Sequence, residues 1–243
     1  MNDKTPKILM LVEGAKTDVR LMNHLLDVYG ISDNHIVVSY NTNIYTLYRE
    51  MFSDGDPDSI DILQLLKSRE KDLEKKKLFD EIYSDILLIF DLDPQDPDFS
   101  YEKISEMQNY FVESSDMGKL YLNYPMVEAF YHMKSIPDEE YLLRTVDLCD
   151  LGKYKTIVNR ENRNHDYAKF ANCKEECNIV IRKNVEKGLL ITKKQSDNCL
   201  PDLSNILQAQ LKMIRSDKKC LCCVPVDTTL QILTRNLFLS SIS

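Results

Sequence analysis

Short apolar runs alternate with longer amphipathic stretches along the first half of the chain. Residues 8–12 (ILMLV) and residues 86–90 (ILLIF) contain only apolar side chains, a pattern typical of strands buried on both faces of a parallel sheet. The pattern predicts strands at about residues 7–13, 35–40, 85–90 and 118–122.

Stretches with apolar residues at helical spacing separate these strands. After the first strand, Thr17 and Asp18 offer helix-starting side chains, and Gly30 is expected to end that helix. Further helices are predicted at residues 44–52, 59–82 and 101–112, and a helix after Pro125 carries Glu128. This order predicts an α/β fold with a mostly parallel sheet of about four strands and helices on both faces.

Beyond residue 150 the pattern weakens. Residues 151–157 fit a loop or a strand, residues 166–185 are predicted to be mainly helical, and Gly188 is expected to break the chain before a short apolar run. Helices are also predicted at residues 201–215 and 226–239. We therefore expect an α/β domain in residues 1–150, with a helical insertion at about residues 44–82, and a mainly helical C-terminal region in residues 151–243.

Carboxylates follow the two most apolar strands. Glu13-Gly14 ends the first run, and Asp91-Leu92-Asp93 ends the second, 78 positions later. If these strands are neighbours in an open parallel sheet, their carboxyl ends bring Glu13, Asp91 and Asp93 together at the edge where ligands bind. Because gathered carboxylates repel one another, the pattern favours a hard divalent cation such as Mg²⁺ and phosphoryl-transfer chemistry.

Charge is distributed unevenly along the 243 residues, although the net charge is only −8. Residues 1–150 hold 15 Lys and Arg against 30 Asp and Glu, whereas residues 151–194 hold 11 against 5. A local basic segment in an acidic protein is compatible with binding to phosphates, and equally with a solvated surface helix or hairpin.

Composition narrows the cellular setting. No apolar stretch approaches the length of about 20 residues needed to span a membrane, and the N-terminus lacks the basic and apolar regions of a signal peptide. The seven cysteines, an odd number, do not resemble a secreted disulfide framework. We expect a cytoplasmic protein with reduced thiols. A zinc clamp is a weaker alternative, suggested by the spacing of Cys173 and Cys177 and by that of Cys220, Cys222 and Cys223.

The acidic motifs resemble those of the Toprim domain of topoisomerases, bacterial primases and OLD-type nucleases. The resemblance rests on LVEG at residues 11–14 followed by Thr17-Asp18, on the DLD motif at residues 91–93, and on residues 123–130 (NYPMVEAF). The last segment looks like an element of the stand-alone Toprim nucleases of bacterial defence systems, including RloB-like and abortive-infection proteins. The similarity covers about residues 7–134, and no P-loop sequence occurs.

The resemblance implies a metal-dependent endonuclease. Its catalytic residues would be Glu13, Asp91, Asp93 and Glu128, which would bind Mg²⁺ or Mn²⁺ together with Asp96 as a third-acid candidate. Glu13 could instead move a proton, and Glu128 could hold a second metal or be only a first-turn acid. The basic segment would hold the RNA or DNA backbone through Lys153, Lys155, Arg160, Arg163 and Lys169.

The same resemblance implies a toxic effector of anti-phage defence, restrained by a partner ATPase or sensor protein, and a homodimer is compatible with it. Three other interpretations stay open at this stage. One is a catalytically degenerate Toprim-fold subunit that binds a partner protein. The others are a receiver-like phosphoacceptor domain and a haloacid-dehalogenase phosphatase, although the phosphatase places its DxD motif on the first strand.

Overall fold

The computed structural model describes residues 7–115, 117–193 and 201–224. Its centre is a five-stranded sheet with the strand order β2-β1-β3-β5-β4. The strands are β1 (Lys7–Val12), β2 (His35–Ser39), β3 (Tyr83–Asp91), β4 (Val112–Glu113) and β5 (Gly118–Asn123). The four predicted strands are all present and parallel, and β4 adds a short antiparallel edge. The prediction of a mostly parallel α/β sheet is therefore confirmed.

The middle of the sheet is formed by the two apolar runs. β1 lies between β2 and β3, with Leu9 beside Ile36 on one side and Ile86 on the other. Leu9, Leu11 and Leu88 have no exposed surface. Both faces of these strands are covered, which explains why their sequences are apolar throughout instead of alternating.

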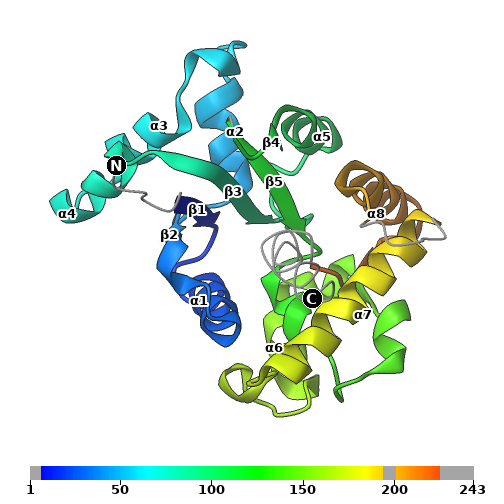
Figure 1. Ribbon diagram of the computed structural model, residues 1–243. Helices are drawn as coiled ribbons and strands as arrows, with labels where there is room; N and C mark the ends of the chain where they lie inside the picture. Colours follow the sequence, from blue (N-terminus) through cyan, green and yellow to red (C-terminus); the bar gives the residue numbers. More distant parts are fainter. Residues whose placement is uncertain (1–6, 116, 194–200, 225–243) are drawn as a thin grey trace.

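Helices cover both faces of the sheet (Figure 1). The α1 helix (Thr17–Tyr29) connects β1 to β2, its neighbour on one side. The α2 helix (Ile44–Phe52) lies in the connection from β2 to β3, and α5 (Tyr101–Tyr110) lies in the connection from β3 to β5. These two connections cross the sheet in the direction opposite to that of the first. Right-handed crossovers consequently place α1 on one face and α2 and α5 on the other. α1 ends before Gly30, as predicted.

The predicted helix at residues 59–82 is wrong. This stretch contains η2 (Pro57–Ser59), α3 (Ile62–Arg69), α4 (Leu73–Lys76) and η3 (Lys77–Asp80). Glu70 is extended and ends α3, and the Asp72 carboxylate accepts hydrogen bonds from the backbone N–H groups of Glu74 and Lys75. Local capping therefore divides a charged segment that lacks a continuous apolar face.

Two other helix boundaries also differ from the sequence prediction. α5 ends at Tyr110, because Val112 leaves the helix to pair with Lys119 of β5. The helix expected after Pro125 is the short 3-10 helix η4 (Val127–Tyr131). All five residues of η4 are buried, so it has no polar face to turn toward water.

The C-terminal part contains three α-helices among its described residues. In chain order its elements are η5 (Glu139–Leu143), β6 (Thr145–Asp147), η6 (Leu148–Lys153), α6 (Tyr154–Glu161), η7 (Tyr167–Lys169), α7 (Lys174–Thr192), α8 (Leu203–Asp217) and β7 (Lys219–Leu221). The loop or strand expected at residues 151–157 is wrong, since α6 begins there. The mainly helical stretch expected at residues 166–185 is correct only from Lys174 onward.

Gly188 does not break the chain, because α7 continues through it. A Cβ at this position would lie 2.8 Å from Cγ of Pro201, so the glycine admits a close neighbour instead of ending the helix. The helix predicted at residues 226–239 lies outside the described residues.

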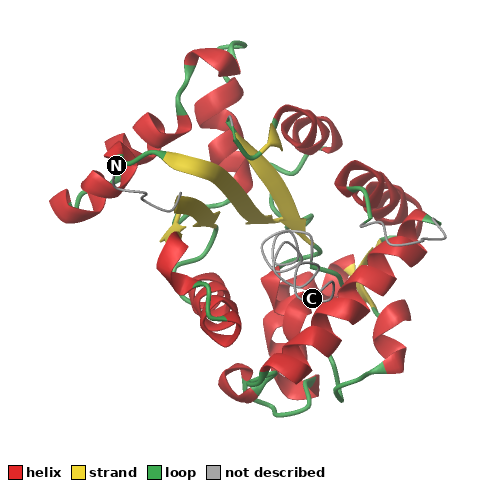
Figure 2. Ribbon diagram, in the orientation of Figure 1, coloured by secondary structure: helices red, strands yellow, loops and turns green. Residues whose placement is uncertain are grey.

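A backbone bridge joins the N-terminal and C-terminal parts. Tyr124, directly after β5, pairs with Cys223, which follows β7. β7 in turn pairs with β6 in a two-stranded antiparallel sheet of the C-terminal part (Figure 2). The buried side chains of both parts belong to one hydrophobic core. In the described ranges, no helix is both long and apolar enough to cross a membrane.

Candidate metal centre

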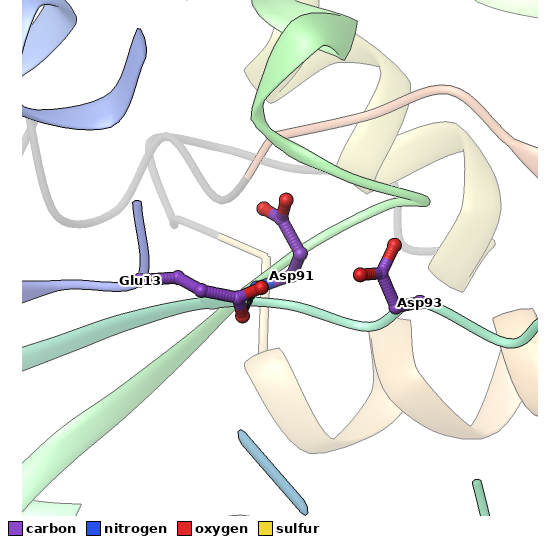
Figure 3. Close-up of side chains that lie close together, drawn as sticks. All are labelled: Glu13, Asp91 and Asp93. Atoms are coloured by element: carbon purple, nitrogen blue, oxygen red, sulfur yellow. Dashed lines mark hydrogen bonds between the residues drawn. The ribbon is translucent and has the colours of Figure 1, made fainter. Parts of the chain in front are cut away.

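Three carboxylates meet at the carboxyl edge of the sheet (Figure 3). One oxygen from each of Glu13, Asp91 and Asp93 lies within 4.8 Å of the other two. The register of the sheet explains this arrangement, because β1 and β3 are neighbouring parallel strands and the N–H of Glu13 donates to the carbonyl of Ile89 at 3.1 Å. The juxtaposition predicted from the two apolar runs is present in the structure.

Asp91 is held firmly inside the site. Its side chain is 5% exposed, and Oδ1 accepts hydrogen bonds from Asn123 Nδ2 at 2.9 Å and from the Val127 N–H at 2.8 Å. Asn123 ends β5 and Val127 begins η4, so both neighbouring elements orient this carboxylate. In the part of the chain that the structure describes, Oδ2 has no hydrogen-bond partner, which leaves it available to a ligand.

Asp93 reaches the same space through a turn of the backbone. Leu92 is completely buried, whereas Asp93 has a positive φ of 41° and its N–H donates to the carbonyl of Pro125 at 3.1 Å. Aspartate tolerates this left-handed conformation better than most residues. Asp93 Oδ1 also accepts from Gln95 Nε2 at 3.0 Å.

Burial and mutual repulsion disfavour the charged forms of these acids. Burial, followed by the charge of Asp93, raises the pKa of Glu13 to about 8. Burial also raises the pKa of Asp93 to about 6, and burial together with Glu13 raises that of Asp91 well above its usual range. A cation between the three carboxylates would relieve both effects, so Glu13, Asp91 and Asp93 could hold a metal ion.

Glu128 lies close to this group on η4. It is 1% exposed; Oε1 lies 3.2 Å from Lys155 Nζ, and Oε2 is buried without a hydrogen-bond partner. The charge of Glu128 contributes to the raised pKa values of Asp91 and Asp93. A buried carboxylate with an unpaired oxygen is costly unless another positive group approaches it, so Glu128 could interact with a cation in addition to Lys155.

Asp18 interacts electrostatically with these acids, although it is not one of the three that could share an ion, and it was missed as a site residue. Its side chain is 6% exposed, and Oδ1 is buried without a partner. Burial, followed by the charge of Glu128, raises its pKa to about 6. A signal was present in the sequence, since Asp18 occupies the helical stripe that includes Leu21, Met22 and Leu25. A carboxylate on a buried stripe requires a partner.

Asp96 is not part of the acidic group. Its Oδ2 accepts a hydrogen bond from Asn43 Nδ2 at 2.7 Å, and its Oδ1 accepts from the Asp98 N–H at 2.8 Å. The contact with Asn43 fastens the loop after β3 to the start of α2, and the contact with Asp98 lies within that loop. The third-acid role considered for Asp96 is therefore not supported by its position.

The five basic residues assigned to nucleic-acid binding are not equivalent. Lys155 alone among them is paired with an acid of the site, Glu128. Arg163 forms two hydrogen bonds with Glu176, at 2.7 and 3.0 Å, while Arg160 contacts Glu161 and Lys169 lies 3.8 Å from Asp166. Lys153 is exposed next to the start of α6. Only the beginning of α6 is therefore placed directly beside the carboxylates.

The basic segment also contains an interior lysine. Lys187 is completely buried and donates hydrogen bonds to the carbonyls of Tyr141 and Arg144, both at 2.7 Å. Burial lowers its pKa to about 8. Lys187 thus stabilises the packing of α7 against η5 and is not available at the surface.

The cysteines of the described residues carry free thiols. Cys177, Cys220, Cys222 and Cys223 are buried, and Cys149 and Cys173 are exposed. Within the described ranges, the only group of three or more His, Cys, Asp or Glu ligands close enough to share an ion is the acidic group of Glu13, Asp91 and Asp93. The zinc-clamp alternative therefore has no support from these positions.

Comparison of the sequence with protein-family models gives no match, and neither a curated protein nor a solved structure matches the chain. Function is therefore inferred from the residues of the site.

Proposed function

We propose that this protein is a divalent-metal-dependent nuclease with a Toprim-like catalytic domain. The observation that carries the proposal is the convergence of Glu13, Asp91 and Asp93, whose ligand atoms lie within 4.8 Å of one another at the carboxyl edge of the sheet. Ligands of open α/β proteins bind at this edge. The order of these acids along the chain is also the order expected from the resemblance to Toprim domains.

The residues fit a hard divalent ion. Every potential ligand in the group is a carboxylate oxygen, which suits Mg²⁺, with Mn²⁺ able to replace it. The unpaired buried oxygens of Asp18 and Glu128 provide additional acceptors next to the three central acids. When bound, such an ion offsets the negative charge that develops on a phosphate during displacement.

The protein side chains divide the remaining work. Asp91 is fixed by Asn123 and Val127, so it is the rigid ligand of the group. Glu13 either completes the metal site or exchanges a proton with the attacking or leaving oxygen. Lys155 lies between Glu128 and solvent, where its ammonium group can contact a substrate phosphate.

Other functions fit the site less well. A phosphoacceptor domain needs an accessible aspartate, whereas Asp91 is 5% exposed and already accepts two hydrogen bonds through Oδ1. The DxD motif follows β3 and not the first strand, in contrast to a haloacid-dehalogenase phosphatase. A non-catalytic binding subunit would have no need for several buried acids with raised pKa values.

The biological setting in this proposal comes from the resemblance. The substrate is RNA or DNA, and the protein would be a cytoplasmic effector of anti-phage defence that a partner ATPase or sensor restrains. Expression of the chain alone, with and without Glu13→Gln, tests the need for restraint. Toxicity of the wild-type chain that the variant removes supports this setting, and harmless expression of active wild-type protein contradicts it.

The decisive experiment is incubation of the purified protein with tRNA, plasmid DNA and single-stranded DNA, in Mg²⁺ or in EDTA. Cleavage of at least one substrate is expected only with the metal. Glu13→Gln and Asp91→Asn, which keep side-chain size, should lower the rate by at least about 100-fold. Glu74→Gln is the matched control, because Glu74 is exposed on α4. Metal-independent cleavage, or equal rates in all four proteins, would refute the proposal.

A further inference from the structure

Two stacked tyrosines lie beside the acidic group. The rings of Tyr131 and Tyr167 are 4.6 Å apart at their centroids and tilted by 25°. Tyr131 is 3% exposed, whereas Tyr167 is the outer, partly exposed member of the pair. Among the described residues, Tyr131 is the only aromatic ring that contacts Tyr167, so no ring covers its other face.

A chain of contacts connects this pair to the candidate metal centre. The hydroxyl of Tyr167 donates to the carbonyl of Lys155 at 2.8 Å, and Lys155 Nζ lies 3.2 Å from Glu128. Burial and the charge of Glu128 both raise the pKa of Tyr167. Lys155 therefore connects the tyrosine pair to Glu128, and the hydrogen bond holds the ring of Tyr167 in a fixed orientation.

Two cations, Arg20 and Lys155, lie near the stacked rings. Arg20, on the exposed side of α1, is close enough to the Tyr131 hydroxyl for a hydrogen bond that favours the charged form of that tyrosine. Lys155, on α6, is 66% exposed in its side chain. In the portion of the chain that is described, Arg20 has no ion-pair partner even though the neighbouring centre is acidic. α1, which carries Arg20, and α6, which carries Lys155, both pack against η4.

We infer that Tyr167 is a stacking platform for one unpaired base of the substrate, and that Arg20 and Lys155 bind phosphates next to that base. This inference rests on the proposed nuclease function and narrows its substrate to a nucleic acid with a single-stranded segment next to the cleaved bond.

Physical chemistry favours a single strand for this surface. The flat face of an aromatic side chain can only stack on a base that has left the duplex, because both faces of a paired base are already covered. A ring fixed by a neighbouring tyrosine and by a hydrogen bond loses little conformational entropy on binding. Cations close to the ring suit a nucleic-acid backbone, because the phosphates next to a stacked base carry negative charge.

The test is binding of fluorescent oligonucleotides in EDTA, so that cleavage plays no part. Wild-type protein should bind a single strand or a stem with an unpaired loop more tightly than a blunt duplex of the same sequence. Tyr167→Leu should weaken single-strand binding about 5- to 150-fold and leave duplex binding unchanged. Tyr167→Phe keeps the ring and should remain within a few-fold of wild type. Tyr48→Leu is the control, because Tyr48 stacks on Phe52 on a helix of the opposite face.

The cations are tested by salt dependence in the same assay. Arg20→Ala should reduce the slope of log affinity against log salt by about 0.7 for a single strand, whereas Lys71→Ala, at an exposed site between α3 and α4, should leave it unchanged. Equal losses for single strand and duplex in Tyr167→Leu, or no loss in either, would overturn the inference. Binding that depends on Tyr167 in a protein without Mg²⁺-dependent cleavage would refute the nuclease function alone, and cleavage independent of Tyr167 would refute the platform alone.

Discussion

The backbone N–H of Asp91 donates a hydrogen bond to Glu13 Oε2 at 3.1 Å, across 78 positions of sequence. This bond holds the Glu13 carboxylate next to Asp91 at the end of β3. The first helix has Lys16 at its N-cap position, without a side-chain hydrogen bond to the cap. Glu13 is therefore a member of the acidic group and does not cap α1.

The acidic group should make the metal-free protein less stable as pH rises. The folded-state pKa of Glu13 is about 8, above its usual 4.5, so the folded protein binds more protons than the unfolded chain between these values. The free energy of unfolding consequently falls as pH rises through this window. Thermal unfolding in EDTA should give a lower Tm at pH 8 than at pH 5.5.

Two comparisons test this pH dependence. Glu13→Gln should flatten it, because the variant has no titrating group at that position. Mg²⁺ should raise the Tm of wild-type protein more at pH 8 than at pH 5.5, since protons compete with the ion for the carboxylates. A wild-type Tm profile in EDTA that Glu13→Gln does not alter would contradict the assignment.

Asp91→Asn should separate metal binding from folding. The amide oxygen can still accept the hydrogen bonds of Asn123 and Val127, while the buried negative charge is removed. We expect the metal-free variant at pH 8 to be more stable than wild type by about 1 kcal/mol, corresponding to about 2–4 °C in Tm. Titration calorimetry should show weaker Mg²⁺ binding by at least about tenfold. A large loss of Tm without metal would show that Asp91 is mainly structural.

Gly14→Ala should disturb the site through Asp18. A Cβ at residue 14 would lie 2.5 Å from Asp18 Oδ2, so the carboxylate must move. We expect at least about a tenfold loss of Mg²⁺-dependent cleavage with intact secondary structure by circular dichroism. Gly152→Ala is the matched control, because an added Cβ there meets no atom within 4 Å. Unchanged cleavage in Gly14→Ala would argue against a role for Asp18.

Arg163 and Lys155 should behave differently when they are replaced. Arg163 forms a two-bond pair with Glu176, so Arg163→Ala should cost stability of about 0.5–1 kcal/mol with little effect on substrate affinity. Lys155→Ala should instead weaken substrate binding, because it removes the cation beside Glu128. Denaturant unfolding and oligonucleotide binding measure the two effects. Equal losses of affinity in the two variants would favour a continuous basic strip.

Much of the sheet and of the central acids was predictable from sequence because the signals are local. A strand buried on both faces must be apolar along its length, and the residue that follows it emerges at the edge of the sheet. Residues 8–12 and 86–90 therefore defined two buried strands that end at carboxylates. The pairing of β1 with β3, which was only a condition of the sequence prediction, brings Glu13, Asp91 and Asp93 to one edge. Helix α1 was also predictable from the sequence, since its apolar stripe and Gly30 set its extent.

Tertiary contacts decided the rest. The pairing of Val112 with β5 shortened α5, and the close approach of Pro201 gave Gly188 a role within α7. The burial of Asp18 and the pairing of Glu128 with Lys155 depend on how α1, η4 and α6 pack together. Sequence periodicity reports which face of an element is buried, but it does not report which distant element covers that face. The acids at the strand ends were therefore determined by the sequence itself, whereas the cations and rings around them were brought there only by the folded chain.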